Sequence, residues 1–407
     1  MADGITRIAV EGFKSITKRQ EIEIAPLTIL AGANNSGKSS IMQPLLMLKQ
    51  TLEATYDPGP LKIDGPNVTF TSSDQFLSKI GLSARGPMRI ELVGKKAVLD
   101  VTFAKGERLE VKEESYTVDG EMLTLRPAMS KQEIEEALSD SWKIMADQLL
   151  VRPDRFYLTL RDGGSPPTWV PYPDLGIEDV IHVPGMRGSP SRTYSVAHVS
   201  HAFPGTFDNY VASVILAWQK DRRNLYEALI SDLQRLGLAQ ILLARRINDV
   251  EIELQVGIGR NELERLDNIA DVGVGVSQVL PALVALRAAE PGRLVYLEEP
   301  EIHLHPRAQV KLADILAHAA KRGVRVVVET HSSLLLRAVQ TLVARDDLDP
   351  ELVRLHWFTR NAAGVTQVSS AKLDANGAFG DWPEDFGDVA LGSEQEYLDA
   401  VEDRLTH

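Results

Sequence analysis

A glycine-rich segment near the N-terminus carries the residue types that bind the phosphates of a nucleotide. The run Gly32-Ala33-Asn34-Asn35-Ser36-Gly37-Lys38-Ser39 fits the pattern G-x-x-x-x-G-K-[ST]. Glycines let backbone N–H groups curl around phosphates, the lysine reaches the β and γ phosphates, and the final hydroxyl coordinates Mg²⁺. We therefore expect ATP and Mg²⁺ as cofactors. The residues expected to bind the nucleotide are Gly32, Asn34, Asn35, Ser36, Gly37, Lys38, Ser39 and Ser40.

Two adjacent acids follow an apolar run in the last third of the chain. Residues Leu294 to Leu297 are typical of a buried strand, and Glu298 and Glu299 come directly after them. The end of a strand can place one carboxylate toward Mg²⁺ and the next toward the water that attacks the γ phosphate. We expect Glu298 on the metal side with Ser39, acting through water, and Glu299 as the general base. A solvated acidic turn is the alternative interpretation.

A histidine follows a second predicted buried strand. His331 comes after the apolar run from Val324 to Val328, so it would lie beside the γ phosphate and could stabilise the charge that develops there. A lone histidine is more often structural than catalytic. Because both acids and the phosphate loop support it, we group His331 with Lys38 and Glu299 as catalytic residues.

A second glycine-rich loop lies far from the first in the sequence. Asp271 to Gln278 precedes a predicted helix and offers glycine N–H groups and a hydroxyl, which make another phosphate-binding concavity. One ATP molecule cannot easily use two such loops from a single subunit. We therefore expect this loop to close on the nucleotide of a second subunit, in a homodimer or higher homo-oligomer. Its nucleotide-binding residues would be Gly273, Gly275, Ser277 and Gln278.

The elements that flank the first glycine loop are those that this chemistry requires. Alternating apolar and polar residues over 5–10 and 21–24 predict an opening antiparallel pair. The apolar run over 27–31 predicts a buried strand that leads into the loop, and the apolar spacing over 40–52 predicts a helix that follows it.

The last third of the chain alternates between helices and strands. Helices are predicted over 278–289, 306–320 and 333–344, and strands over 294–297 and 324–328. Such alternation predicts a parallel sheet covered by helices, with the ligand at the carboxyl ends of the strands. The expected fold class is α/β: a P-loop ATPase head with a mixed or parallel sheet flanked by helices, an N-terminal antiparallel β element and an α+β insertion.

The middle of the chain predicts a β-meander and then helices. Alternation over 88–125, with Asp119-Gly120 as a hairpin turn, predicts the meander. Ser130 and Glu133 form a capping box that opens a helix expected to run to about Leu150. The segments expected after it are a Pro/Gly-rich stretch over 162–173, a strand over 180–183 and a helical region over 207–236.

These patterns divide the chain into four parts. They are an N-terminal lobe of the head (1–104), an inserted β and helical segment (105–177), a C-terminal lobe with a helical subdomain (178–370) and a tail (371–407). We expect the insertion, together with helices over 200–245, to face a partner or DNA.

Composition and charge exclude several classes of protein. The 407 residues are 44% hydrophobic and 25% charged, which favours a globular protein over a disordered one. Since the chain has no cysteine, it has no disulfides, thiolate zinc sites or cysteine nucleophiles. The net charge of −13 argues against a surface built wholly for nucleic acid, but short basic clusters at 95–96, 220–223 and 245–246 leave local DNA contact open. Without a long apolar run or a signal peptide, we expect a cytoplasmic protein with no membrane contact.

Together these motifs resemble the ABC-type ATPases of the SMC, RecF and OLD group. The residues that carry the resemblance are Gly12-Phe13-Lys14-Ser15, the loop from Gly32 to Ser40, Gly273 to Gln278 as a divergent signature motif, Glu298 to Pro306 as E-E-P-E-x-x-L-H-P, and Thr330-His331-Ser332. The resemblance implies that ATP joins two heads, with each signature loop facing the partner's γ phosphate. The signature loop here is not L-S-G-G-Q, and the metal-side acid is Glu298 rather than the aspartate usual in transporters.

The resemblance further implies a Q-loop glutamine and a separate effector. Gln75 stands near the place of the metal-binding Q-loop residue, although a solvated loop glutamine fits the sequence equally well. The tail around Trp382 and Phe386 looks like that of OLD-like ATPases without a fused Toprim nuclease. A nuclease would then have to come from another chain.

The leading hypothesis is a Mg²⁺-dependent ATPase that dimerises around ATP and controls a partner effector, in bacterial defence against phage or in DNA maintenance. An ATP-gated structural scaffold with incidental turnover is one alternative. The ATPase subunit of a transporter is another, but Lys38 and Glu298 lie farther apart in the sequence than is usual there.

Overall fold

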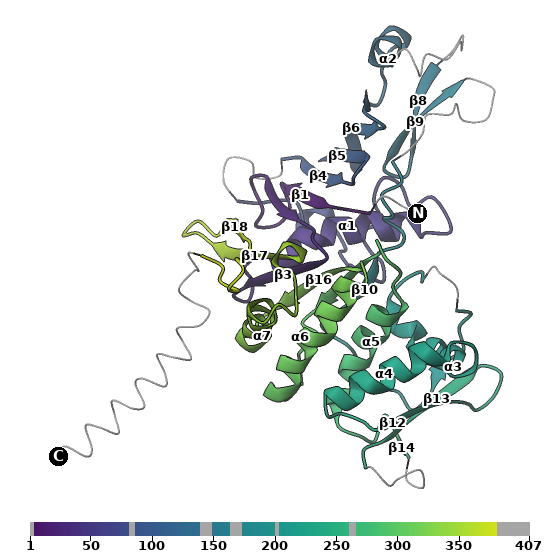
Figure 1. Ribbon diagram of the computed structural model, residues 1–407. Coiled ribbons are helices and arrows are strands. Elements are labelled where there is room, and N and C mark those ends of the chain that lie inside the picture. Colours follow the sequence, from purple (N-terminus) through teal and green to yellow (C-terminus); the bar gives the residue numbers. More distant parts are fainter. Residues whose placement is uncertain are drawn as a thin grey trace, which may run out of the picture.

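Two six-stranded sheets, with helix α1 (Lys38–Leu52) packed between them, form the centre of the molecule (Figure 1). The computed structural model describes residues 4–80, 86–138, 149–162, 173–199, 203–259 and 266–380. Three helices cover the outer face of one sheet, and a smaller subdomain of helices and strands lies beside them (Figure 1). The predicted α/β class, with a mixed sheet and an N-terminal antiparallel element, is confirmed.

The sheet that carries the candidate site is mixed and has the order β10-β15-β16-β3-β17-β18. Its strands are β3 (Leu27–Gly32), β10 (Ile181–Val183), β15 (Leu294–Glu298), β16 (Arg325–Thr330), β17 (Val353–Arg360) and β18 (Thr366–Ala371). The first five in this order run parallel, and β18 pairs antiparallel with β17. The carboxyl ends of β3, β15 and β16 therefore meet at one edge, as the sequence predicts. The strands β17 and β18 are an addition that the sequence analysis did not anticipate.

The other sheet is antiparallel and has the order β2-β1-β4-β5-β6-β7. Its strands are β1 (Arg7–Glu11), β2 (Gln20–Glu23), β4 (Met88–Val93), β5 (Ala97–Lys105), β6 (Leu109–Val118) and β7 (Glu121–Leu125). Asp119 (φ 51°) and Gly120 (φ 87°) adopt the left-handed conformation that a two-residue hairpin turn needs. The predicted meander is confirmed. The expected boundary between residues 104 and 105 falls within β5, and β6 and β7 extend the same sheet.

Two hydrophobic cores hold the helices against the sheets. One core joins α1 to both sheets through buried residues such as Leu30, Leu45 and Ile90. The other packs three helices on the opposite face of the mixed sheet: α5 (Val274–Ala288), α6 (Pro306–Lys321) and α7 (Ser333–Ala344). Helix α5 begins at Val274 rather than at the expected Gln278, because Gly273 is its N-cap residue. The helix therefore takes in residues 274–278 of the second glycine loop.

The helix opened by Ser130 is shorter than the sequence predicts. The capping box with Glu133 is present, but α2 (Lys131–Ala137) ends well before Leu150, and residues 139–148 lie outside the described part. Leu149 and Leu150 belong instead to β8 (Leu149–Asp154), which pairs with β9 (Tyr157–Asp162) in a hairpin. Pairing across the hairpin thus overrides the local helical pattern. Most of the Pro/Gly-rich stretch over 162–173 lies outside the described residues.

The predicted helical region over 207–236 is three elements rather than one. They are η3 (Phe207–Tyr210), α3 (Val211–Asp221) and α4 (Arg223–Arg235). The break falls at Arg222, which leaves helical geometry at φ −137° and ψ 60°. Beyond Gly237 the expected helix to residue 245 is wrong, since residues 241–246 form a strand of a small antiparallel sheet. Its strands are β11 (Tyr194–Ser195), β12 (Ile241–Arg246), β13 (Glu251–Gly257) and β14 (Asp267–Asn268).

Two short 3₁₀ helices, η1 (Ser73–Gln75) and η4 (Pro350–Leu352), complete the elements of the described chain. Trp382 and Phe386 of the expected tail lie outside the described residues. In the part of the chain that is described, no helix combines the length and the apolar character needed to cross a membrane.

Candidate active site

The phosphate loop has a backbone that only glycine accommodates at two of its positions. Gly32 has φ 143° and Gly37 has φ 111°. A Cβ on Gly32 would lie 2.3 Å from the carbonyl oxygen of Phe358, and one on Gly37 would lie 2.4 Å from Oγ1 of Thr366. The loop is therefore packed tightly against β17 and β18, with the N-terminus of α1 directly behind it.

Ser36 lies within this loop and has an unused polar atom. Its side chain is 4% exposed, and its Oγ has no hydrogen-bond partner among the residues that the structure describes. Buried polar groups are normally paired, so an orphan hydroxyl at a helix N-terminus fits a phosphate as its missing partner. The loop residues thus fit the nucleotide that the sequence predicts.

Lys38 spans the loop from the first turn of α1. Its Nζ donates hydrogen bonds to the carbonyl oxygens of Gly32 and Ala33, each at 3.0 Å, and lies 4.0 Å from Oε1 of Glu329. Burial lowers the pKa of Lys38, while the charges of Glu329, Glu299 and Glu301 raise it. The ammonium is therefore placed at the junction of the loop with the acidic strand ends.

Glu329, at the end of β16, is the acid that contacts the serine of the loop. Ser39 Oγ donates to Glu329 Oε1 at 2.9 Å, and Tyr296 Oη donates to Oε2 at 2.8 Å. Burial raises the pKa of Glu329 to about 7, and the charge of Glu298 acts in the same direction. The sequence analysis missed this residue. The sequence could have indicated Glu329 by its position, because it directly precedes Thr330 and His331. Its register with Glu298 on β15 is visible only in the folded sheet.

Glu298 faces a different segment from the one the sequence suggests. Its Oε1 lies 3.2 Å from Nε2 of His182, and its Oε2 accepts a hydrogen bond from the backbone N–H of Gly185 at 3.0 Å. Burial acts to raise the pKa of Glu298, but the hydrogen bond and charge of His182 and the N–H of Gly185 outweigh it and lower the pKa. Glu298 is therefore held as a carboxylate beside the Ser39–Glu329 pair rather than against Ser39.

Glu299 and His331 form a pair at the carboxyl ends of β15 and β16. His331 Nε2 lies 3.0 Å from Glu299 Oε1. Glu299 has the left-handed φ of 43°, and its backbone N–H donates to the carbonyl oxygen of Glu329 at 2.8 Å. Burial and the charge of Lys38 lower the pKa of His331, against the opposing effect of Glu299. The structure thus brings together the three residues expected to be catalytic.

Two further residues fix the turn that follows Glu299. Buried Glu301 accepts hydrogen bonds from Thr330 Oγ1 and from the backbone N–H of His331. His305 is the N-cap of α6, and its Nδ1 accepts from the N–H of Arg307 at 3.3 Å. These contacts hold the base and the histidine at a defined position relative to the sheet.

The hollow over the loop has a volume of about 190 Å³, and besides Glu329 it includes three polar residues that the sequence analysis did not assign to the site. Lys14 Nζ donates to Gln43 Oε1 at 2.7 Å, and Arg360 Nη2 donates to Asn35 Oδ1 at 3.2 Å. Lys14 belongs to the Gly12-Phe13-Lys14-Ser15 motif. This motif lies beside the phosphate loop only because strands that are distant in the sequence pair with each other. Two cations therefore flank the phosphate loop in addition to Lys38.

Gln75 and the second glycine loop are not gathered into this hollow. Gln75 is exposed, and its Oε1 accepts a hydrogen bond from Thr71 N within its own turn. None of Gly273, Gly275, Ser277 or Gln278 lines the hollow at Lys38. Ser277 Oγ donates to the carbonyl oxygen of Val274, and Gln278 Nε2 donates to that of Gly188.

Mg²⁺ at this site would share its ligands with the nucleotide. Among the residues that the structure describes, no group of three or more His, Asp or Glu side chains is placed to hold a metal ion. Mg²⁺ usually binds one or two carboxylates together with phosphate oxygens and waters, which fits Ser39 and the nearby acids.

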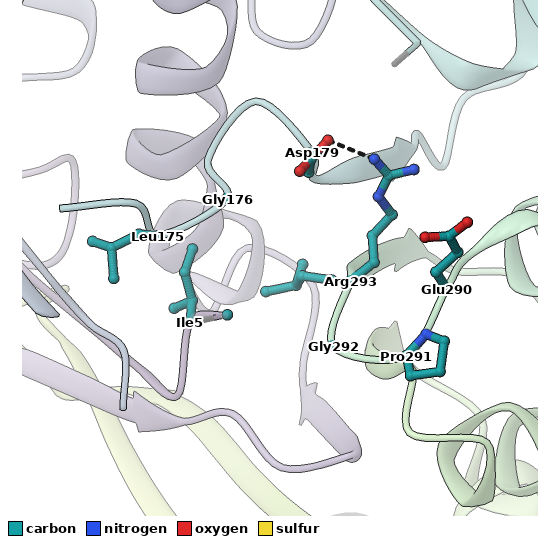
Figure 2. Close-up of a pocket in the computed structure, with 10 residues that line it drawn as sticks. Ile5, Leu175, Gly176, Asp179, Glu290, Pro291, Gly292 and Arg293 are labelled. Atoms are coloured by element: carbon teal, nitrogen blue, oxygen red, sulfur yellow. Dashed lines mark hydrogen bonds and ion pairs between the residues drawn. The ribbon is translucent and has the colours of Figure 1, made fainter. Parts of the chain in front are cut away.

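A second hollow, of about 270 Å³, lies at the opposite end of β15 (Figure 2). Its lining includes Ile5, Leu175, Gly176 and the turn that precedes Leu294, and the ion pair of Asp179 with Arg293 lies at 2.5 Å on its wall (Figure 2). Since Glu298 and Glu299 lie at the other end of the same strand, this hollow is not part of the candidate active site.

Two family models match separate parts of the chain. A model described as "AAA ATPase domain" matches residues 4–149, and one described as "AAA domain, putative AbiEii toxin, Type IV TA system" matches residues 178–337. The first segment contains the phosphate loop, and the second contains Glu298, Glu299 and His331, which the fold brings to that loop. Both models describe AAA-type ATPase domains, so the chain is an ATPase.

Solved structures that match this ATPase include SMC heads. The SMC head bound to the C-winged helix domain of ScpA is 13% identical at a TM-score of 0.47, with 91% of this chain and 98% of that chain covered. The SMC head domain from Thermotoga maritima is 14% identical at 0.43, with 90% and 98% covered. The Smc head with an extended coiled coil, bound to the C-terminal domain of ScpA derived from Pyrococcus furiosus, is 11% identical at 0.46, with 98% and 99% covered. No curated protein matches this ATPase in sequence.

Proposed function

We propose that ATP and Mg²⁺ join two copies of this ATPase and that the joined pair controls a separate effector protein. The observation that carries the proposal is the position of the loop from Gly273 to Gln278. It presents glycine N–H groups at the N-terminus of α5, yet it lies outside the hollow at Lys38 of its own chain. A second copy of the chain supplies the nucleotide that this loop would contact.

Exposed apolar side chains beside this loop support the same proposal. Val274, in the first turn of α5, is 51% exposed, and Met186, in the segment that contacts that turn, is 97% exposed. Removing apolar side chains from water favours association. A second head that docks over the loop would cover them.

Each residue of the site would then have a separate role in hydrolysis. Lys38, Ser39 and the backbone N–H groups of the loop would hold the phosphates, and Glu298 would serve the Mg²⁺ ion through water. Bound ATP with Mg²⁺ supplies the scissile phosphoanhydride bond and the charge neutralisation at its oxygens. Glu299 accepts the proton of the attacking water, and His331, 3.0 Å from it, orients the carboxylate and faces the charge that develops.

The proposal also includes a separate effector protein and a role in defence. The family model over residues 178–337 names the AbiEii toxin and a Type IV TA system, which supports a role in defence alongside a partner. We place the protein in the cytoplasm and propose a nuclease as the separate effector, as the OLD-like motif implies. Arg245 and Arg246 at the exposed end of β12 are the surface on which a DNA contact would be sought.

The decisive experiment measures oligomer size with and without ATP. Glu299→Gln keeps the shape of the base but removes its proton acceptor, so it should bind ATP with Mg²⁺ and accumulate as a dimer in light scattering. Lys38→Ala should neither bind ATP nor dimerise. A Glu299→Gln protein that stays monomeric with saturating ATP would refute the dimer, and wild-type dimers without turnover would favour the ATP-gated scaffold.

A further inference from the structure

The end of β10 and the segment that follows it, residues 182–188, hold the strand-end acid Glu298 from three sides. His182 Nε2 lies 3.2 Å from one carboxylate oxygen, and the N–H of Gly185 donates to the other at 3.0 Å. The Nη2 of Arg187 donates to the backbone carbonyl of Glu298 at 2.9 Å. Both the side chain and the main chain of this acid are therefore positioned by one short segment.

Arg187 also connects this segment to helix α5, which begins in the loop from Gly273 to Gln278. Its Nη1 donates to the carbonyl oxygen of Gln278, in the first turns of α5, and its Nε donates to the carbonyl oxygen of Pro184 at 2.8 Å. In return, Gln278 Nε2 donates to the carbonyl oxygen of Gly188 at 3.2 Å. The guanidinium of Arg187 thus connects the end of β15, the start of α5 and the segment that follows β10.

The chemistry of this contact requires arginine rather than any cation. Three acceptors lie in three directions around the guanidinium, and its rigid planar fork presents separate donors to each of them. Burial lowers the pKa of Arg187, and the charges of Glu298, Glu301, Asp208 and Glu299 act against that lowering. Lysine would keep the charge but would present it as a compact point that cannot reach all three carbonyls in one geometry.

We propose that Arg187 is a positioning residue that couples strand β15, which ends in Glu298, to helix α5. It sets the orientation in which the loop from Gly273 to Gln278 is presented to a second head, and it links that orientation to the position of Glu298. This inference rests on the proposed function, in which the loop contacts the nucleotide of a partner subunit. Arg187 does not line the hollow at Lys38, so binding of ATP to a single head does not require it.

The test places Arg187→Ala and Arg187→Lys in the Glu299→Gln background and compares each with Glu299→Gln alone. Calorimetric titration with ATP and Mg²⁺, at a protein concentration low enough to keep the heads monomeric, should give a dissociation constant within about twofold of the parent, because the phosphate loop is untouched. Light scattering should show a dimer dissociation constant raised by about tenfold or more for both variants. In the otherwise wild-type protein, kcat should fall by a similar factor while binding to the single head is unchanged.

A matched control and an independent readout keep the result interpretable. Arg223→Ala removes an exposed arginine on α4 that pairs with Glu227, and it should change none of these quantities. Hydrogen exchange reports the coupling without any dimer, since Arg187→Lys should accelerate exchange at Val279 and Leu280 in α5 and leave α1 unchanged.

The possible outcomes separate this inference from the function it rests on. If Glu299→Gln alone does not dimerise, the proposed function fails, and the exchange measurement still decides the role of Arg187. If Glu299→Gln dimerises and Arg187→Lys dimerises equally well with unchanged exchange in α5, the coupling is wrong. Should Arg187→Ala not fold, Arg187→Lys decides the question alone, and loss of ATP binding by a folded Arg187→Lys protein would also overturn the positioning role.

Discussion

Glu114 is a buried carboxyl in β6 whose ionisation should weaken the packing of the β8–β9 hairpin. Its side chain has no solvent exposure, and one oxygen accepts a hydrogen bond from the N–H of Leu158 in β9. The other oxygen has no hydrogen-bond partner within the described part of the chain. Burial raises the pKa of Glu114 from 4.5 to about 8, although the hydrogen bond from Leu158 acts to lower it. The perturbation we choose is Glu114→Gln, which keeps the shape and the acceptor but cannot ionise.

The magnitude follows from proton linkage. Since the folded pKa is raised, the folded state holds its proton more tightly, so stability is fully present below pH 4.5 and is lost as the pH rises through about 8. At 1.36 kcal/mol per pKa unit, the loss is about 2 kcal/mol at pH 6 and about 4 kcal/mol at pH 8. The unpaired amide that the substitution introduces has a cost that does not change with pH. The difference between the two proteins should therefore shift by about 2 kcal/mol, or roughly 30-fold, between these pH values.

Hydrogen exchange of the amides in β6 and β9 measures this shift, because an opening that separates the two strands exposes Glu114. The ratio of exchange rates, wild type over Glu114→Gln, should rise roughly 30-fold from pH 6 to pH 8, and taking the ratio removes the intrinsic pH dependence of exchange. Glu113→Gln, at the exposed neighbouring position on β6, should show no such rise. A constant ratio for Glu114→Gln would show that the carboxyl is not desolvated and would refute the argument.

Three further perturbations test the site and the division of the chain. Because burial raises the pKa of Glu329 to about 7, Mg²⁺ should bind together with ATP more tightly at pH 8 than at pH 6 in calorimetry. Glu329→Gln should reduce this dependence to the part that the γ phosphate of ATP contributes by its own titration, and a Glu329→Gln protein with the full wild-type dependence would contradict the role of Glu329. Gly32→Ala forces a Cβ to 2.3 Å from a carbonyl oxygen at φ 143°, which should cost about 1–3 kcal/mol and abolish ATP binding; an unchanged melting temperature would contradict this packing. The strands β6 and β7 belong to the sheet of the head, so the deletion must begin after Leu125. Replacing residues 126–172 by a short linker should leave ATP binding largely intact, and complete loss of binding would contradict the separation of this segment from the head.

Local pattern was sufficient for the elements on either side of the phosphate loop. Strand β3 is a short apolar run, and α7 matches its predicted bounds, because hydrophobic period and capping residues act over a few neighbouring positions. The local sequence pattern gave the wrong secondary structure where pairing between strands determined it. Residues 241–246 became a strand because they pair with β13, and β8 formed because β9 lies opposite it.

The sequence by itself determined where the phosphate loop and the acids at 298 and 299 lie, because these motifs keep their residues within a few positions of each other. Only the tertiary structure decided which acid touches Ser39. Glu329 reaches it because β16 lies between β3 and β15, an order that no local spacing encodes. The same holds for Arg187, whose three acceptors come from residues 184, 278 and 298. Contacts between residues so distant in sequence arise from strand order and helix packing, so they become visible only in the folded chain.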